Sequence, residues 1–234
     1  MSIITSIGII VLSILIMASL QLTPGVFALL YHYSLGRFSR PKAANLALFF
    51  IIGVEFVTAC LFLSIHFLVC IFFFDGVSLE LTLSTWILTG IIIVLGLASP
   101  FLYYRPGPGS KLFISRRYAK ALDYTAKTIK TQSDSFILGV TSGVYELILT
   151  LPLFIVSSIA IVHLNITSPF GNPFSLLFVL SPILPLFIVY WRYQTRHNLA
   201  DIAKSRNSSK SFIRFLLVSS YLLIATLIIL SRII

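Results

Sequence analysis

Six long runs of apolar residues occupy most of the chain and constrain its fold more than any other feature. They cover approximately residues 4–32, 43–74, 81–104, 135–162, 174–191 and 212–231. A helix needs roughly 20 apolar residues to cross a hydrocarbon layer of about 30 Å, whereas strands of a membrane barrel are about 10 residues long and alternate in polarity. Since 58% of the residues are hydrophobic and only 10% are charged, the apolar surface exceeds what a soluble core can hide. The sequence therefore predicts an all-α polytopic membrane protein with six transmembrane helices.

The second run, 43–74, is longer than one crossing requires. A hydrophobic helix of this length either tilts strongly or continues past the membrane interface. We expect one such helix in preference to two short ones.

The basic residues indicate the orientation of these helices. All of the 17 Lys and Arg residues except Arg232 lie at 37–42, 105–130 or 192–214, and segments 75–80 and 163–173 contain none. The positive-inside rule therefore places the three basic loops in the cytoplasm and both termini outside, in a multi-pass protein of the cell (plasma) membrane. We expect anionic lipid headgroups to bind these basic loops. A nucleic-acid partner is not expected, although the net charge is +10.

The order of the runs predicts a duplicated architecture. Three runs at 1–104 form a first half, 105–134 is a basic cytoplasmic loop, and three more runs at 135–234 form a second half. Because the first run begins outside and the fourth begins inside, any repeat must be inverted. Inverted three-helix repeats are a common plan of transporters, with the binding site near the midplane between the halves.

A helix break near the bilayer centre is predicted in the first run. Pro24 and Gly25 lie about twelve residues before Arg37, which is on the order of 18 Å at 1.5 Å per residue. Pro removes a backbone donor and Gly tolerates most backbone angles, so the freed carbonyls, with Gln21 and Thr23 beside them, can form one wall of a polar site. The alternative is a kink that serves only helix packing.

Other groups are expected at a similar depth. Glu55 and Glu146 are the only carboxylates inside the runs, and Pro182 and Pro185 are a predicted hinge in the fifth run. A charged side chain at the centre of a membrane helix costs roughly 2.5 to 3.5 kcal/mol, so two acids need a reason. If they face each other they titrate as a unit and can carry a proton or take a cation. The alternative is that each is protonated and bonded to a neighbouring helix for structure only.

No residue pattern indicates catalysis, a metal or a cofactor. The histidines do not stand at ligand spacing and no CxxC is present, so a metal centre built on His or Cys is not expected. His32 and His66 are interpreted as packed, hydrogen-bonded residues, and Cys60 and Cys70 as ordinary apolar ones. A membrane-embedded enzyme would need a nucleophile and base or a metal, and neither is apparent.

Several short motifs resemble the lysine-exporter (LysE-type) superfamily. They are the Pro-Gly interruption, "SLGR" at 34–37, "GVE" at 53–55 and "GIIIVLGL" at 90–97. The resemblance covers residues 10–104 and, more loosely, 135–165. It implies six spans in two inverted halves and export of amino acids or, in some branches, cations. Two departures are Val26, where the family usually has a second Pro, and "SGVYEL", where it often has Asn-Pro.

The sequence as a whole predicts an exporter of a small amino-acid-like solute or cation, coupled to protons or ions through Glu55 and Glu146. The substrate-facing groups would be Gln21, Thr23, Pro24 and Gly25. A homo-oligomer is compatible with this interpretation. The alternative class is a non-transporting membrane scaffold or assembly subunit, in which the same polar groups only hold helices together.

Overall fold

The computed structural model describes residues 3–20, 39–74, 81–103, 124–125, 128–164, 173–181, 183–196 and 210–233. Seven longer helices make up nearly all of this described part, which contains no strand. The helices are α1 (Ile3–Leu20), α3 (Arg40–Phe74), α4 (Leu81–Tyr103), α6 (Gln132–Val162), α7 (Pro173–Leu180), α8 (Ile183–Arg196) and α10 (Lys210–Ile233). The predicted all-α class is confirmed.

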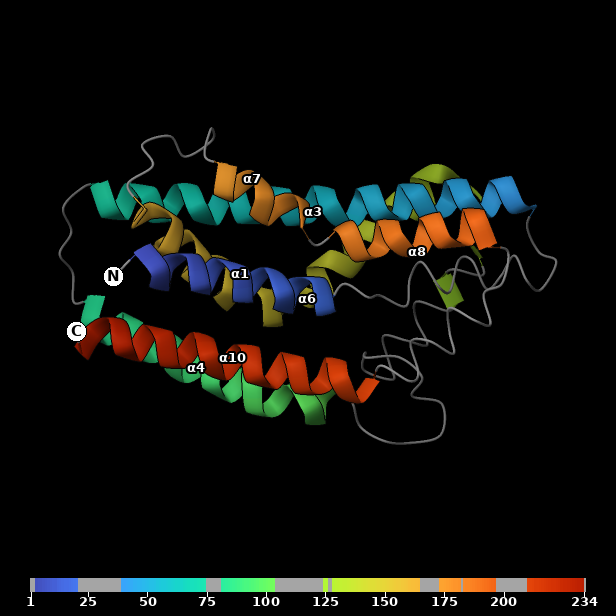
Figure 1. Ribbon diagram of the computed structural model, residues 1–234. Helices are drawn as coiled ribbons and strands as arrows, with labels where there is room; N and C mark the ends of the chain where they lie inside the picture. The colour runs from blue at the N-terminus through green and yellow to red at the C-terminus, as the bar shows by residue number, and fades with distance from the viewer. Residues whose placement is uncertain are drawn as a thin grey trace.

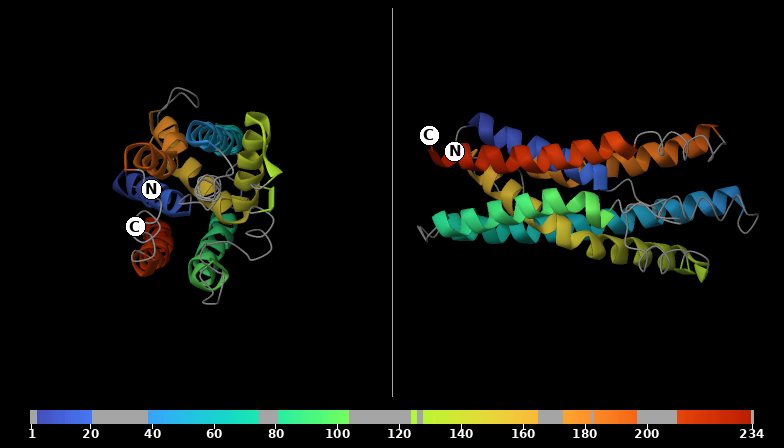
Figure 2. Two further views of the ribbon diagram at one scale, coloured as in Figure 1. Left: turned by 90° about the vertical axis from the view of Figure 1, so that its right-hand side faces the viewer. Right: turned by 90° about the horizontal axis from the view of Figure 1, so that it is seen from below.

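The helices form an elongated bundle in which successive passes alternate in direction (Figure 1). Helices α1, α4 and α7–α8 run one way, and α3, α6 and α10 run the other. Both termini lie at one end (Figure 1). The last residues of α1, α4 and α8 and the first residues of α3, α6 and α10 lie at the opposite end (Figure 2, right). Most of the basic residues belong to the sequence between or beside these helix ends.

Helix α3 agrees with the expectation of one long helix in the second run. Its 35 residues correspond to about 52 Å at 1.5 Å per residue, which exceeds a hydrocarbon layer of about 30 Å. Within the described residues, Pro41–Ile71 is the one stretch long and apolar enough to cross a membrane by length and composition. Four helices contain shorter apolar stretches, at Ile3–Ser19, Trp86–Ala98, Thr150–Val162 and Phe215–Ser231.

The fifth run differs from a single continuous span. Helix α7 ends at Leu180, Ser181 forms a turn, and α8 begins at Ile183. Pro182 lies outside the described residues, and Pro185 is the third residue of α8. Pro is tolerated in the first turn of a helix, where its missing N–H would have no intrahelical partner.

Helices α3 and α6 run parallel and make the most extensive contact in the bundle. A Cβ atom on Gly53 would meet the Phe136 carbonyl oxygen, and one on Gly139 would meet the Phe50 carbonyl oxygen. Only glycine allows backbones this close, an arrangement known from membrane helix pairs with small residues at the crossing. The Ser135 hydroxyl donates to the Leu46 carbonyl at 2.6 Å in the same contact.

The two sides of this crossing have nearly the same sequence. Residues 50–54 read "FIIGV" and residues 136–140 read "FILGV". Each glycine lies against the carbonyl of the other helix's phenylalanine, so the pairing is reciprocal. The correspondence joins helices that run in the same direction, and it is separate from the inverted relation predicted between the halves.

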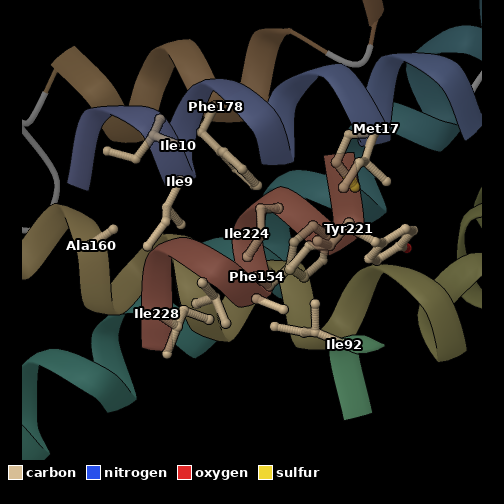
Figure 3. Close-up of a cluster of buried hydrophobic side chains, with 14 of the residues drawn as sticks. Ile9, Ile10, Met17, Ile92, Phe154, Ala160, Phe178, Tyr221, Ile224 and Ile228 are labelled. Atoms are coloured by element: carbon tan, nitrogen blue, oxygen red, sulfur yellow. The ribbon is translucent and has the colours of Figure 1, made fainter. Parts of the chain in front are cut away.

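The main core fills the space between α1, α6, α7 and α10, with contributions from α3 and α4 (Figure 3). Its labelled members include Ile9 and Met17 of α1, Phe154 of α6, Phe178 of α7 and Tyr221 of α10. Helix α4 reaches α10 through Gly96, whose added Cβ would lie 2.7 Å from the Tyr221 Cβ atom.

Large apolar side chains also cover much of the outside of the bundle. Examples from four helices are Ile4 (85% exposed), Val94 (63%), Trp191 (65%) and Phe215 (71%). Monomeric soluble proteins rarely expose contiguous apolar surface on this scale. Exposed apolar surface of this kind marks contact with lipid or with another protein.

Candidate functional site

The residues predicted to form the site are described to different extents. Glu55 lies in α3 with its side chain described. Glu146 lies in α6, and its side chain is outside the described residues. Gln21, Thr23, Pro24 and Gly25 are also outside the described residues, as is Pro182.

Glu55 lies on the side of α3 that is remote from α6. Further along α3, Phe62 contacts Phe154 of α6. At the close crossing, the α3 residues that face α6 include Leu46, Phe50, Gly53 and Val57. At about 100° per residue, Glu55 lies well over 90° from the middle of that face. It shares its own face with residues two and three helical turns further on, Phe62 and His66.

This second face of α3 packs against α7 and α8. The His66 Nε2 atom lies 3.4 Å from the Ser175 Oγ atom, and the Phe62 and Phe178 rings stack with centroids 4.5 Å apart. These two contacts define an antiparallel register. Continued along α3, that register puts the break between α7 and α8 level with Ala59 and the first turn of α8 level with Glu55.

The carbonyls of Phe178 and Ser181, next to the break, are paired within the chain. Because proline has no N–H, Pro182 cannot donate the usual helical bond to the Phe178 carbonyl. The Ser181 hydroxyl donates to that carbonyl instead, at 3.0 Å. The Leu184 N–H donates to the Ser181 carbonyl at 3.3 Å, so the chain reaches α8 through a short, tightened turn.

The Glu55 side chain is only partly satisfied. Its Oε1 atom is buried and has no hydrogen-bond partner in the described part of the chain. A buried carboxylate oxygen without a partner is unfavourable, and carboxyl groups inside membrane helices are characteristic of ion and proton pathways. The group can carry a proton or accept hydrogen bonds from an ammonium group or another cation.

Glu55 and Glu146 are not level with each other along the bundle. An added Cβ on Gly143 would meet the Val57 side chain, so Glu55, two residues earlier, is level with Thr141. Glu146 is five residues beyond Thr141, or about 7 Å further along the axis. This register differs from the similar depth that the sequence predicts, because α3 begins further toward the basic end than α6 does.

A narrow crevice lies between α1, α3 and α6, and Glu55 is not among the residues that line it. It is lined by Met17, Thr58, Leu61, Gly143, Leu147, Thr150 and Phe154. The crevice leaves no room for a water molecule. Any passage along it requires the helices to rearrange.

The second polar cluster on this face of α3 is one that sequence reasoning set aside. His66 is buried among aromatic rings, and its Nε2 atom also lies 3.8 Å from the Cys70 Sγ atom. The sequence signal was a His four residues before a Cys, which places both on one helical face. Ser175, from α7, has no sequence signal that links it to them.

No metal centre is found within the described ranges. No group of three or more His, Cys, Asp or Glu side chains in that part of the chain gathers at ligand geometry. Cys60 and Cys70 are both free thiols.

Comparisons with known proteins give no match. No family model matches the chain, and no curated protein or solved structure is similar to it. The resemblance to lysine exporters therefore stays a prediction.

Proposed function

We propose that the chain is a multi-pass integral membrane transporter that exports a small amino-acid-like solute or a cation. The observation that carries the proposal is the buried, unpartnered Oε1 atom of Glu55, level with the first turn of α8 beyond a helix break. Interrupted helices beside an intramembrane acid are the usual construction of ion and solute sites in transporters.

The arrangement of the helices supports insertion in a membrane. Six helical passes alternate in direction, counting α7 and α8 as one pass (Figure 2). The basic segments connect to one end of these passes, which is the cytoplasmic end by the positive-inside rule. The exposed apolar side chains between the two ends suit the hydrocarbon layer. In the proposal, residues 1–104 and 135–234 are inverted halves in the cell membrane.

The chemistry of the site follows from Glu55. In its ionised form the carboxylate binds a cation or an ammonium group through its negative charge, whereas protonation removes that charge and turns one of the acceptor oxygens into an O–H donor. Solute and proton therefore compete for one group, which couples the two movements. Glu146, Pro24, Gly25, Gln21 and Thr23 complete the proposed pathway, and Pro182 and Pro185 its hinge.

Flux measurements with reconstituted protein test the proposal. Proteoliposomes are loaded with a panel of radiolabelled amino acids, primary amines and monovalent or divalent cations, under a pH gradient imposed in either direction. The proposal predicts flux of at least one solute that exceeds the flux of protein-free vesicles and depends on the gradient. A correctly inserted protein that moves no member of the panel would favour the scaffold.

A further inference from the structure

His66 stands out because a titratable ring is enclosed by apolar surface. Its side chain is 2% exposed. The ring lies nearly parallel to the Phe62 ring, at 7° and with centroids 5.7 Å apart, and Phe62 in turn contacts Phe154 and Phe178. Helices α3, α6 and α7 all contribute to this enclosure.

The hydrogen bonds of the ring are incomplete. A neutral imidazole has one N–H donor and one acceptor nitrogen. The Nε2 atom has the Ser175 hydroxyl and the Cys70 thiol as neighbours, whereas the buried Nδ1 atom has no partner in the described part of the chain. One ring nitrogen is therefore unsatisfied in either tautomer, a cost that an apolar residue of similar shape would avoid.

The surroundings hold the ring in its neutral form. The stretches of α6 and α7 at this level, 150–162 and 173–180, contain no titratable residue. On α3 the neighbouring titratable group is the Cys70 thiol, which is uncharged at neutral pH. Glu55 lies three helical turns away, with Phe62 between them. A proton on His66 would create a buried charge without a counter-charge, which only contact with water relieves.

Of the helices around the ring, α7 is the shortest. It has eight residues, it is separated from α8 by the turn at Ser181, and it meets α3 through Ser175 and Phe178. In contrast, α3 is held at residues 50–57 by the glycine contacts with α6. Admitting water to His66 is therefore easiest by moving α7.

We propose that the His66 imidazole is a proton-binding site that couples the pH at the terminus-bearing end of the bundle to the contact between α3 and α7. The Nδ1 atom takes a proton from a hydronium ion; an N–H bond forms, an O–H bond breaks, water is released and the ring gains one positive charge. The neutral ring keeps Ser175 bound at Nε2, and the charged ring favours a state in which α7 has separated and water enters. The inference rests on the proposed function, since it supplies a proton site on the same face of α3 as Glu55.

The native Cys70 thiol reports this state directly. It is buried beside His66, whereas Cys60 is exposed, so a Cys60→Ser protein leaves Cys70 as the single thiol. The labelling rate of Cys70 by a membrane-impermeant thiol reagent is measured in proteoliposomes at pH 8 and pH 5. Each rate is divided by that of glutathione in the same buffer, which corrects for the pH dependence of the reagent. We expect the corrected rate to rise about tenfold at pH 5, because an imidazole in contact with water, as in the separated state, titrates near pH 6.5 and its protonation favours that state.

Three variants separate the proton site from simple packing. His66→Gln keeps an amide within reach of Ser175 but cannot take a proton, so Cys70 should stay protected at both pH values. Ser175→Ala removes the partner on α7 and should raise the rate at pH 8, which shrinks the pH ratio. The Ser64 hydroxyl is exposed and donates to the Cys60 carbonyl of its own helix, so Ser64→Ala should behave as the parent does.

A pH-independent rate in the parent protein, or an unchanged pH ratio in His66→Gln, would overturn the inference. If His66→Gln fails to fold, the ratio of the Cys70 labelling rates at pH 5 and pH 8 in Ser175→Ala decides instead. A ratio as large as that of the parent would overturn the inference. Because labelling needs no transported solute, pH-dependent labelling without any flux would keep the His66 site and reject the transporter. Solute flux together with pH-independent labelling of Cys70 would keep the transporter and reject the His66 site.

Discussion

The first turn of α6 depends on two side chains that bond to each other's backbone. The Thr131 hydroxyl accepts from the Asp134 N–H at 3.1 Å, and the Asp134 carboxylate accepts from the Thr131 N–H at 3.2 Å. This reciprocal arrangement, a capping box, satisfies donors that a helix start leaves without partners. The bond to the Thr131 side chain, followed by those to the backbone N–H groups of Thr131 and Lys130, lowers the pKa of the Asp134 carboxyl from its usual 3.8.

The lowered pKa gives the start of α6 a defined pH dependence. A carboxyl whose pKa is depressed in the folded state stabilises that state above its unfolded pKa, and this contribution disappears as pH falls through the folded value. Asp134→Asn should therefore speed amide hydrogen exchange in the first turn of α6 at pH 7, with the difference from the parent shrinking below about pH 4. Ser133→Ala, at an exposed neighbouring position, is the matched control. Equal exchange in Asp134→Asn and parent at pH 7 would contradict the capping role.

At this scale the sequence indicates some site residues and not others. Glu55 stands out because an acid in an apolar run is conspicuous. His66 does not, because the residue that explains it, Ser175, is 109 positions away and reaches it only through the packing of α7 on α3. The capping box had a readable signal, a Thr three residues before an acid ahead of an apolar run.

Among the elements, α3 and α6 are held by close backbone approach rather than by large side chains. A methyl group at Gly139 would enter the Phe50 carbonyl, while one at Gly90 of α4 would meet no atom within 4 Å. Both glycines lie inside helices, so replacement by Ala raises the helix propensity equally at the two positions. The two variants therefore differ only in how the added methyl group packs.

The pair yields a matched stability prediction. Gly139→Ala should destabilise the protein by about 1–3 kcal/mol, as overpacking does, and lower its Tm. Gly90→Ala should leave Tm unchanged or raise it, since Ala favours a helix by about 1 kcal/mol over Gly. Thermal unfolding in detergent, followed by circular dichroism, measures both. A Tm for Gly139→Ala at or above that of Gly90→Ala would be incompatible with the crossing.

The sequence predicts the helices where their formation depends on apolar composition alone. Long apolar runs predict helices because a buried or lipid-facing backbone must bond within itself, and α3, α4, α6 and α10 lie over four of the six runs. The apolar runs do not indicate which helices contact each other. The α3–α6 crossing follows from three small residues, Gly53, Ser135 and Gly139, whose spacing acquires meaning only when two helices are aligned.

For the whole molecule, the alternating direction of the helices and the positions of the basic residues together predict the orientation of the protein in a membrane. The account predicts that 33–42, 105–134 and 192–211 face the cytoplasm. In a protein without Cys60 and Cys70, single cysteines at Ser110 and Ser208 should react with an impermeant reagent only after cells are permeabilised. Labelling of either in intact cells would reverse or break the topology.

The sequence did not predict how far along the bundle axis each residue lies relative to residues of the neighbouring helix. Counting from the nearest charged residue places Glu55 and Glu146 at similar heights, whereas the contact of Gly143 with Val57 separates them by about 7 Å. Charge counting locates the ends of a span and gives no account of how far each helix slides against its neighbour.

The most direct measurement of the central claim is pH-driven solute flux in Glu55→Gln. Glutamine keeps the size of the side chain and removes its titratable proton, so the flux that depends on the pH gradient should disappear, and Glu146→Gln should behave similarly. If the acids act as a unit, the double variant should be no worse than the worse single one. Thr141→Val, level with Glu55 on α6 and exposed, should keep parental flux. Gradient-driven flux at the parental rate in both Glu variants, with normal insertion, would contradict the account.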